Sequence, residues 1–124
     1  MTKVLKEPKT AIEKSTAEKI LAPVPYANGF HFFTSIGAYT GETAVSLEHF
    51  TREIQIIPLE SIEFHVKRGD FQKWIVDTLG DVELAEEIGR IEENLSGEPL
   101  RKRLLTVLNA RINTLKTQMS QFRE

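Results

Sequence analysis

The fold is decided by the stretch at residues 68–81, which reads RGDFQKWIVDTLGD. A Gly-Asp pair stands near each end of it, at 69–70 and at 80–81. Glycine readily adopts the left-handed conformation that closes a helix, and aspartate accepts backbone N–H bonds at the start of the next one. Between the two pairs, apolar residues follow the spacing of one helix face, at Phe71, Trp74, Ile75 and Leu79. The stretch therefore predicts a central helix with one helix before it and another after it.

Helical spacing continues on both sides of this stretch. Upstream, Ser46 is a favourable N-cap for apolar residues that step by three and four, at Leu47, Phe50, Ile54 and Ile57. Pro58 ends that helix or opens the next, which residues 59–66 predict, although alternate residues there also fit a strand. Downstream, one helix starts at Asp81, and a long last helix covers residues 99–122.

The segment at 30–34 is short and rich in aromatic residues, which is typical of a strand, and 42–45 is the candidate return strand. Gly37 and Gly41 lie between them and indicate a turn. A lone two-stranded hairpin is only marginally stable in water, so it must pack on helices. The predicted fold class is therefore α+β and mostly helical, with a short N-terminal β-hairpin packed on about five helices and a long C-terminal helix.

A single globular domain over residues 30–124 accounts for these elements, because chains of about 100–150 residues commonly form one domain. Residues 1–29 predict an arm that is flexible or held by a partner. Its apolar residues are sparse, and prolines interrupt it at Pro8, Pro23 and Pro25.

Composition narrows the classes of function. The chain has no cysteine, which excludes disulfides and thiolate nucleophiles. No apolar run approaches the ~20 residues that span a bilayer, and the N-terminus lacks the apolar core of a secretory signal. We therefore expect a cytoplasmic protein without a membrane partner. The net charge of −2 combines +2 over 1–29, −9 over 30–98 and +5 over 99–124, which suits either a charged partner or pairing within one fold.

Two apolar patterns overlap on the last predicted helix. One is a core stripe, and the other is a heptad seam that continues past the length a small domain would cover. The seam residues are the candidate partner-binding set: Leu105, Leu108, Ile112, Leu115, Met119 and Phe122. They predict docking of a protein partner or a second copy of the chain. The alternative is that the N-terminal arm or the hairpin covers the distal end of this helix.

Basic residues on the same helix are candidates for nucleic-acid binding, together with the lysine-bearing arm. They are Arg101, Lys102, Arg103, Arg111 and Lys116. The aromatic residues lie elsewhere in the chain, so no base-stacking platform interleaves with these cations. The alternative is that the basic groups pair with the acidic helix that precedes them.

A cluster of chemically versatile residues surrounds the first Gly-Asp pair, at His65, Arg68, Asp70 and Trp74. An Asp–Arg–His group at a helix junction suits acid–base chemistry or anion binding. The structural interpretation is that Asp70 caps a helix, Arg68 pairs with a carboxylate, and Trp74 lies in the core.

Other sequence features predict no catalytic residue, metal or cofactor. The histidines at 31, 49 and 65 match no familiar metal-ligand spacing. His49 and its acidic neighbours Glu48 and Glu53 predict a solvated helix face. No phosphate-binding loop or nucleophile elbow is present.

The patterns F-H-x-x-R-G-D-F-x-x-W-I at residues 64–75 and L-G-D-x-x-L-A at 79–85 resemble those of a family of small archaeal and bacterial proteins. That family is a domain of unknown function, and the resemblance covers roughly residues 25–115. It implies no activity. Some members of the family lie beside or within carbohydrate-handling proteins.

These observations together predict a non-catalytic adaptor or regulatory protein that docks a partner or a second copy through its C-terminal helix. The alternative is a protein associated with nucleic acid, such as structured RNA, through its basic ends. A third class is an accessory protein of carbohydrate metabolism.

Overall fold

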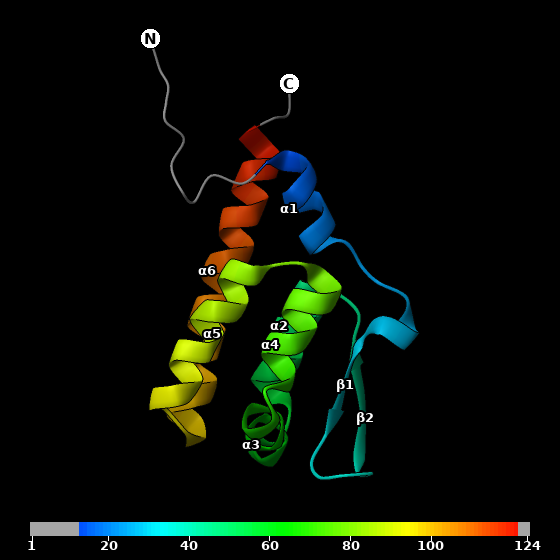
Figure 1. The fold of residues 1–124 in the computed structure, drawn as a ribbon, viewed down its shortest axis with the longest axis vertical. Coiled ribbons are helices and arrows are strands. Elements are labelled where there is room, and N and C mark those ends of the chain that lie inside the picture. The colour runs from blue at the N-terminus through cyan, green and yellow to red at the C-terminus, as the bar shows by residue number, and fades with distance from the viewer. Residues whose placement is uncertain (1–12, 122–124) are drawn as a thin grey trace.

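The computed structural model describes residues 13–121 as six α-helices, a β-hairpin and two short helical turns (Figure 1). The predicted fold class is confirmed, including the N-terminal hairpin and the long last helix. The elements are α1 (Lys14–Leu21), the 3₁₀ turn η2 (Tyr26–Asn28), β1 (Phe30–Phe33), β2 (Tyr39–Ala44), α2 (Leu47–Ile56), α3 (Leu59–Arg68), α4 (Asp70–Trp74), the π-helical turn η3 (Ile75–Leu79), α5 (Val82–Asn94) and α6 (Gly97–Gln121).

Helix α6 runs along the length of the molecule, and other helices pack against it (Figure 1). Helices α1, α2, α3 and α5 all pack against it. Its buried face consists of Leu100, Leu104, Val107, Leu108, Ile112 and Leu115. These residues complete one continuous apolar core with the inner faces of the shorter helices and of the hairpin.

The two Gly-Asp junctions differ, although their sequences are alike. Gly69 and Gly80 both adopt the left-handed conformation, with φ of 71° and 82°, as predicted. Asp81 is an N-cap whose Oδ1 accepts from the Leu84 N–H at 3.1 Å. Asp70, in contrast, is the first residue of α4 and makes no capping bond. Its predicted capping role is wrong because its carboxylate turns back to His65 on α3.

The hairpin is antiparallel, with Phe30 opposite Ala44 and Phe33 opposite Tyr39. Phe30 and Phe32 are buried, whereas His31 and Phe33 are half-buried on the other face. This alternation follows from the two-residue period of a strand. Strand β2 begins at Tyr39, three positions before the predicted start, so the turn is shorter than expected.

The described part of the predicted arm packs on the domain. Helix α1 lies against the distal part of α6 (Figure 1), and it buries Ala17 and Ile20. The Val24 N–H then donates to the Val45 carbonyl at 2.8 Å. Residues 13–29 are therefore part of the domain, in contrast to the prediction, because a short apolar stripe suffices to cover the end of α6. Residues 1–12 of the predicted arm lie outside the described residues.

Candidate functional site

A groove of about 430 Å³ lies between the hairpin and the wall formed by α3, α4 and η3. Its lining is mostly apolar, with contributions from Phe33, Ile36, Phe64 and Trp74. Four charged side chains also line it: Arg68, Asp70, Lys73 and Asp77. The groove therefore brings the hairpin and the predicted His65 cluster together.

Side chains of α3 fix strand β1 along the groove. The Phe33 N–H donates to Nε2 of His65 at 2.9 Å, and the Ser61 hydroxyl donates to the Phe33 carbonyl at 2.8 Å. On α4, the indole N–H of Trp74 donates to the Asn28 carbonyl at 2.9 Å. Three polar side chains thus satisfy backbone groups of the segment that forms the opposite wall, and this fixes the position of that segment against α3 and α4.

The hydrogen bonds of His65 determine its tautomer. Its Nδ1 lies 2.8 Å from Oδ2 of Asp70, and its Nε2 accepts from a backbone N–H, so the proton resides on Nδ1. The ring is buried, and this desolvation lowers the pKa of His65 below its ordinary value, although Asp70 opposes the shift. His65 is therefore neutral at physiological pH. The Nε2 lone pair that a general base would use is already engaged.

Arg68 completes the cluster at the rim of the groove. Its Nε donates to Oδ2 of Asp70 at 2.9 Å, and its guanidinium carbon lies 5.2 Å from the centroid of the Phe64 ring. The side chain is 49% exposed. The structure thus joins three predicted residues directly, His65, Arg68 and Asp70, while Trp74 contributes its ring to the same groove.

The predicted docking seam lies mostly inside the domain. Leu108, Ile112 and Leu115 are buried in the core, and Leu105 and Met119 are partly buried against it. Phe122 lies outside the described residues. Helix α1 covers the part of α6 near Met119, which corresponds to the intramolecular alternative. Because Leu108, Ile112 and Leu115 lie in the core, they leave no free face for a partner at these positions.

Three of the five basic candidates make contacts within the chain. Arg101 donates to the carbonyl oxygens of Ile54 and Ile57 at the end of α2, at 2.9 and 2.7 Å. Arg111 binds both carboxylate oxygens of Asp81 at 2.8 Å. Lys116 lies 2.6 Å from Glu48. Lys102 and Arg103 are exposed.

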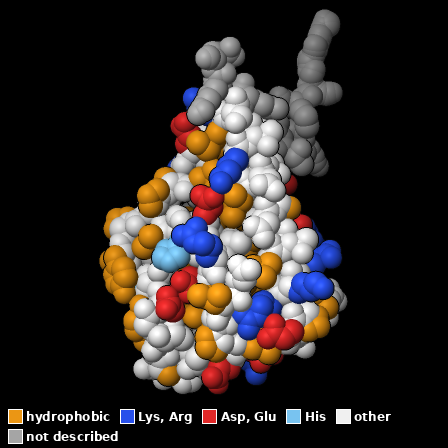
Figure 2. Space-filling model, turned by 180° about the vertical axis from the view of Figure 1, so that it is seen from behind, with side chains coloured by type: hydrophobic (Ala, Val, Ile, Leu, Met, Phe, Trp, Pro, Cys, Tyr) orange, Lys and Arg blue, Asp and Glu red, His pale blue; other side chains and the backbone are white. Residues whose placement is uncertain are grey.

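Cations do not gather into one continuous patch on the face drawn in Figure 2. Lys and Arg side chains there are interspersed with Asp and Glu side chains. This distribution agrees with the internal pairing of Arg111 and Lys116 with acidic residues of other helices. That face therefore has no extended basic patch to which a phosphate backbone could bind.

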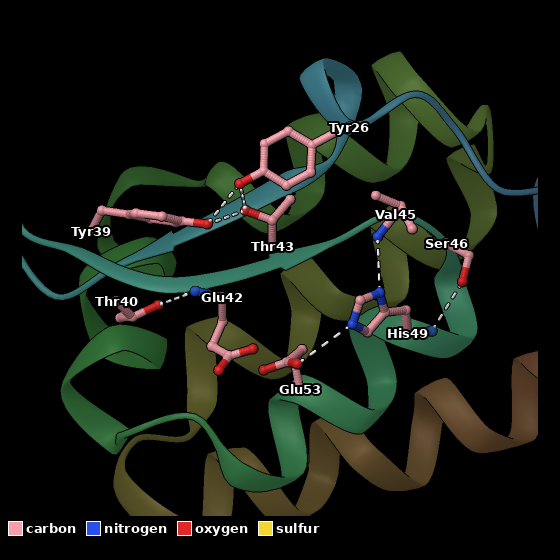
Figure 3. Close-up of polar contacts among 9 residues, drawn as sticks. All are labelled: Tyr26, Tyr39, Thr40, Glu42, Thr43, Val45, Ser46, His49 and Glu53. Atoms are coloured by element: carbon pink, nitrogen blue, oxygen red, sulfur yellow. Dashed lines mark hydrogen bonds and ion pairs between the residues drawn. The ribbon is translucent and has the colours of Figure 1, made fainter.

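A second polar cluster joins β2 to α2 (Figure 3). The Val45 N–H donates to Nδ1 of His49 at 3.3 Å, and Nε2 of His49 faces Oε2 of Glu53 at 3.5 Å. Glu53 is buried, and its Oε1 has no hydrogen-bond partner among the described residues. Burial, followed by the facing Glu42 carboxyl, raises the pKa of Glu53. The predicted solvated face is wrong at Glu53, which lies beside Ile54 at the edge of the apolar stripe.

The outer face of the hairpin carries residues that the sequence analysis did not select. The Thr43 hydroxyl lies 2.5 Å from the Tyr39 hydroxyl and 3.3 Å from that of Tyr26 (Figure 3). It also lies 2.8 Å from Nδ1 of His31, which lines the groove. Tyr26 was assigned to the arm and Tyr39 to the turn. The one signal that pointed to this face is the even spacing of Tyr39 and Thr43, which places both side chains on the same side of a strand.

Within residues 13–121, no group of three or more His, Asp or Glu side chains is arranged to hold a metal ion. In the same range, no helix combines the length and apolar character required to cross a membrane.

The sequence of this small helical domain matches a family model over residues 4–108, which includes the hairpin and both walls of the groove. The chain belongs to that family, DUF5752, a family of unknown function. No curated protein and no solved structure matches the chain.

Proposed function

We propose that this protein is a non-catalytic binding module whose groove between β1 and α3–α4 holds a small apolar molecule. The observation that carries the proposal is the groove itself, with its volume of about 430 Å³ and its mostly apolar lining. Small-molecule sites are typically concave, apolar and roughly 300–1,000 Å³ in volume, with a few polar groups that orient the ligand. A preformed groove also avoids the entropic cost of ordering a loop on binding.

The state of the polar groups supports a binding role over catalysis. His65 and Asp70 would be the natural base and orienting carboxylate of an acid–base site. Nε2 of His65, however, accepts from Phe33, and Oδ2 of Asp70 receives both His65 and Arg68. These groups maintain the shape of the groove.

The other sequence-based functions remain predictions. Docking through the C-terminal helix gains no support from α6, because its seam is largely in the core. Nucleic-acid binding retains the exposed Lys102 and Arg103. A carbohydrate-linked accessory role, an archaeal or bacterial origin and a cytoplasmic location also remain predictions.

A neutral fluorescent probe tests the proposal, since Trp74 is the single tryptophan of the chain and lines the groove. Energy transfer from Trp74 to bound N-phenyl-1-naphthylamine reports occupancy of this site. Ile36, which is 78% exposed and lines the groove, is the residue to change. Ile56 is 72% exposed outside the groove and provides the matched control.

Ile36→Ser should weaken probe binding about tenfold, because it removes an apolar contact made mainly in the complex. Ile56→Ser should leave the affinity unchanged. Absence of saturable transfer in the wild-type protein, or equal effects of the two variants, would exclude the groove as the binding site.

A further inference from the structure

We infer that the groove selects an organic carboxylate, with its apolar body against Phe33, Phe64 and Trp74 and its carboxylate on the guanidinium of Arg68. This inference rests on the proposed function and adds the charge and headgroup of the ligand. It follows from how Arg68 is held, from which charged groups at the rim are already engaged, and from the geometry of guanidinium recognition.

Arg68 is held in place by two contacts that leave part of its guanidinium available. Nε is bound to Asp70 at 2.9 Å, and the guanidinium carbon lies 5.2 Å from the Phe64 ring centroid. The hydrogen bond to Asp70 uses Nε, and the side chain is half-exposed, so its two terminal NH₂ groups are left to a ligand. Since its orientation is set before binding, little conformational freedom is lost on contact.

The four charged side chains of the lining, Arg68, Asp70, Lys73 and Asp77, sum to zero. An anion is therefore favoured by the placement of the N–H donors and not by the net charge. Asp70 Oδ2 already receives N–H donors from His65 and Arg68, so its charge is largely compensated. Asp77 pairs with Lys73 at 3.3 Å, with side chains 59% and 77% exposed. Such exposed pairs are weak and readily exchanged. An entering anion therefore meets a fixed guanidinium and a mobile ammonium on the same wall.

The headgroup follows from the geometry of a guanidinium. Its planar fork of N–H donors matches the two oxygens of a carboxylate, and charge-assisted hydrogen bonds of this kind are stronger than neutral ones. Arginine keeps its charge at all physiological pH values, so the contact persists beside an apolar wall. A singly charged carboxylate needs one such partner, which is what Arg68 offers at the edge of the apolar lining.

A matched pair of probes tests the inference: 2-naphthylacetate and 2-naphthylacetamide share a body and differ in the charge of the headgroup. Calorimetric titration at low ionic strength should show the carboxylate binding about tenfold more tightly than the amide. Arg68→Gln should remove this preference, so that the carboxylate and the amide bind with similar affinities. Arg103→Gln removes an exposed cation on α6 and should preserve the preference.

The outcomes separate the two proposals. Equal affinities of the wild-type protein for both probes, or an Arg68→Gln variant that weakens both equally, would overturn the carboxylate inference and leave the apolar groove in place. If neither probe binds, and N-phenyl-1-naphthylamine also fails, the proposed function falls with it. Arg68→Lys, which keeps the charge without the fork, should retain only part of the preference.

Discussion

Nε2 of His65 on α3 accepts the backbone N–H of Phe33 on β1 at 2.9 Å, across 32 positions of sequence. His65, whose side chain could serve in acid–base catalysis, therefore has a structural role here. Because Nδ1 of the same ring donates to Asp70, one imidazole links strand β1 to the junction of α3 and α4. The shape of the groove depends on that link.

His65→Phe should destabilise the fold by about 1–3 kcal/mol. The phenyl ring keeps the apolar volume of the site, but it leaves the Phe33 N–H without an acceptor and Asp70 with Arg68 alone of its two donors. Chemical denaturation measures the difference in the free energy of unfolding. Lys67→Ala, on the exposed side of the same helix, is the control and should stay within about 0.5 kcal/mol of wild type. A fully stable His65→Phe protein would show that the ring is not a structural link.

Asp81→Ala should be more damaging, at about 3–5 kcal/mol. This nearly buried carboxylate caps α5 through Leu84 and receives two N–H bonds from Arg111. Its loss leaves the largely buried guanidinium with only the exposed Glu83 carboxylate, 3.5 Å away. In a double-mutant cycle, Arg111→Met should be less harmful in the Asp81→Ala background than alone. Additive effects of the two substitutions would argue against a coupled pair.

Glu92 should make stability depend on pH. Burial raises its pKa to about 7, although the Gln72 amide, which donates to Oε1 at 2.8 Å, opposes the shift. Between the unfolded pKa, about 4.3, and the folded value, the native state binds the proton more tightly than the unfolded chain. The stabilisation is complete below the unfolded pKa and is lost as the pH rises through the folded one.

Glu92→Gln should therefore raise the free energy of unfolding at pH 8 by roughly 1–2 kcal/mol, a range reduced for solvent screening at a partly exposed group. It should change little at pH 3.3, about one unit below the unfolded pKa, where the carboxyl group is largely protonated in both states. Urea titrations at the two pH values provide the measurement, and Glu93→Gln at the exposed neighbouring position is the control. An equal effect at both pH values would assign the change to packing.

Ile20→Ala should lower the stability of the isolated chain by about 2–4 kcal/mol, because Ile20 is buried where α1 packs on the domain. Thermal or chemical denaturation measures this change in the free energy of unfolding. Lys19→Ala, on the exposed face of α1, should have little effect. If Ile20→Ala is as stable as the wild-type protein, α1 contributes nothing to the core and behaves as the arm predicted from sequence.

Local patterns accounted for most of the secondary structure. Residues 59–66 also fitted a strand, but α3 forms there because its apolar positions meet the core at helical intervals. Gly69 and Gly80 end helices as expected, since their conformation is a property of the residue itself. Tertiary contacts overrode the local rule at Asp70, where His65 and Arg68 compete successfully with the helix N-terminus for its carboxylate.

The functional assignments were less predictable, because they depend on which surfaces remain uncovered. The spacing of Leu108, Ile112 and Leu115 identified an apolar face of α6 without indicating whether the chain itself or a partner covers it. In the structure, α1 packs against α6. The apolar residues of α1 are too few and too irregularly spaced for its position to be predicted from sequence. Likewise, the sequence shows Arg111 as one of several basic residues but does not indicate its partner. The packing of the helices brings it to Asp81, thirty positions away.

The sequence by itself determined the helical periodicity, the left-handed helix ends at Gly69 and Gly80, the Asp81 cap and the presence of a hairpin, because each depends on residues within a few positions of one another. Only the tertiary structure decided that Phe33 meets His65, that Arg68 lies beside Phe64 at the rim of an apolar groove, and that Glu53 is buried. These features depend on burial and on contacts between distant segments, which the packing of α6 against its neighbours creates.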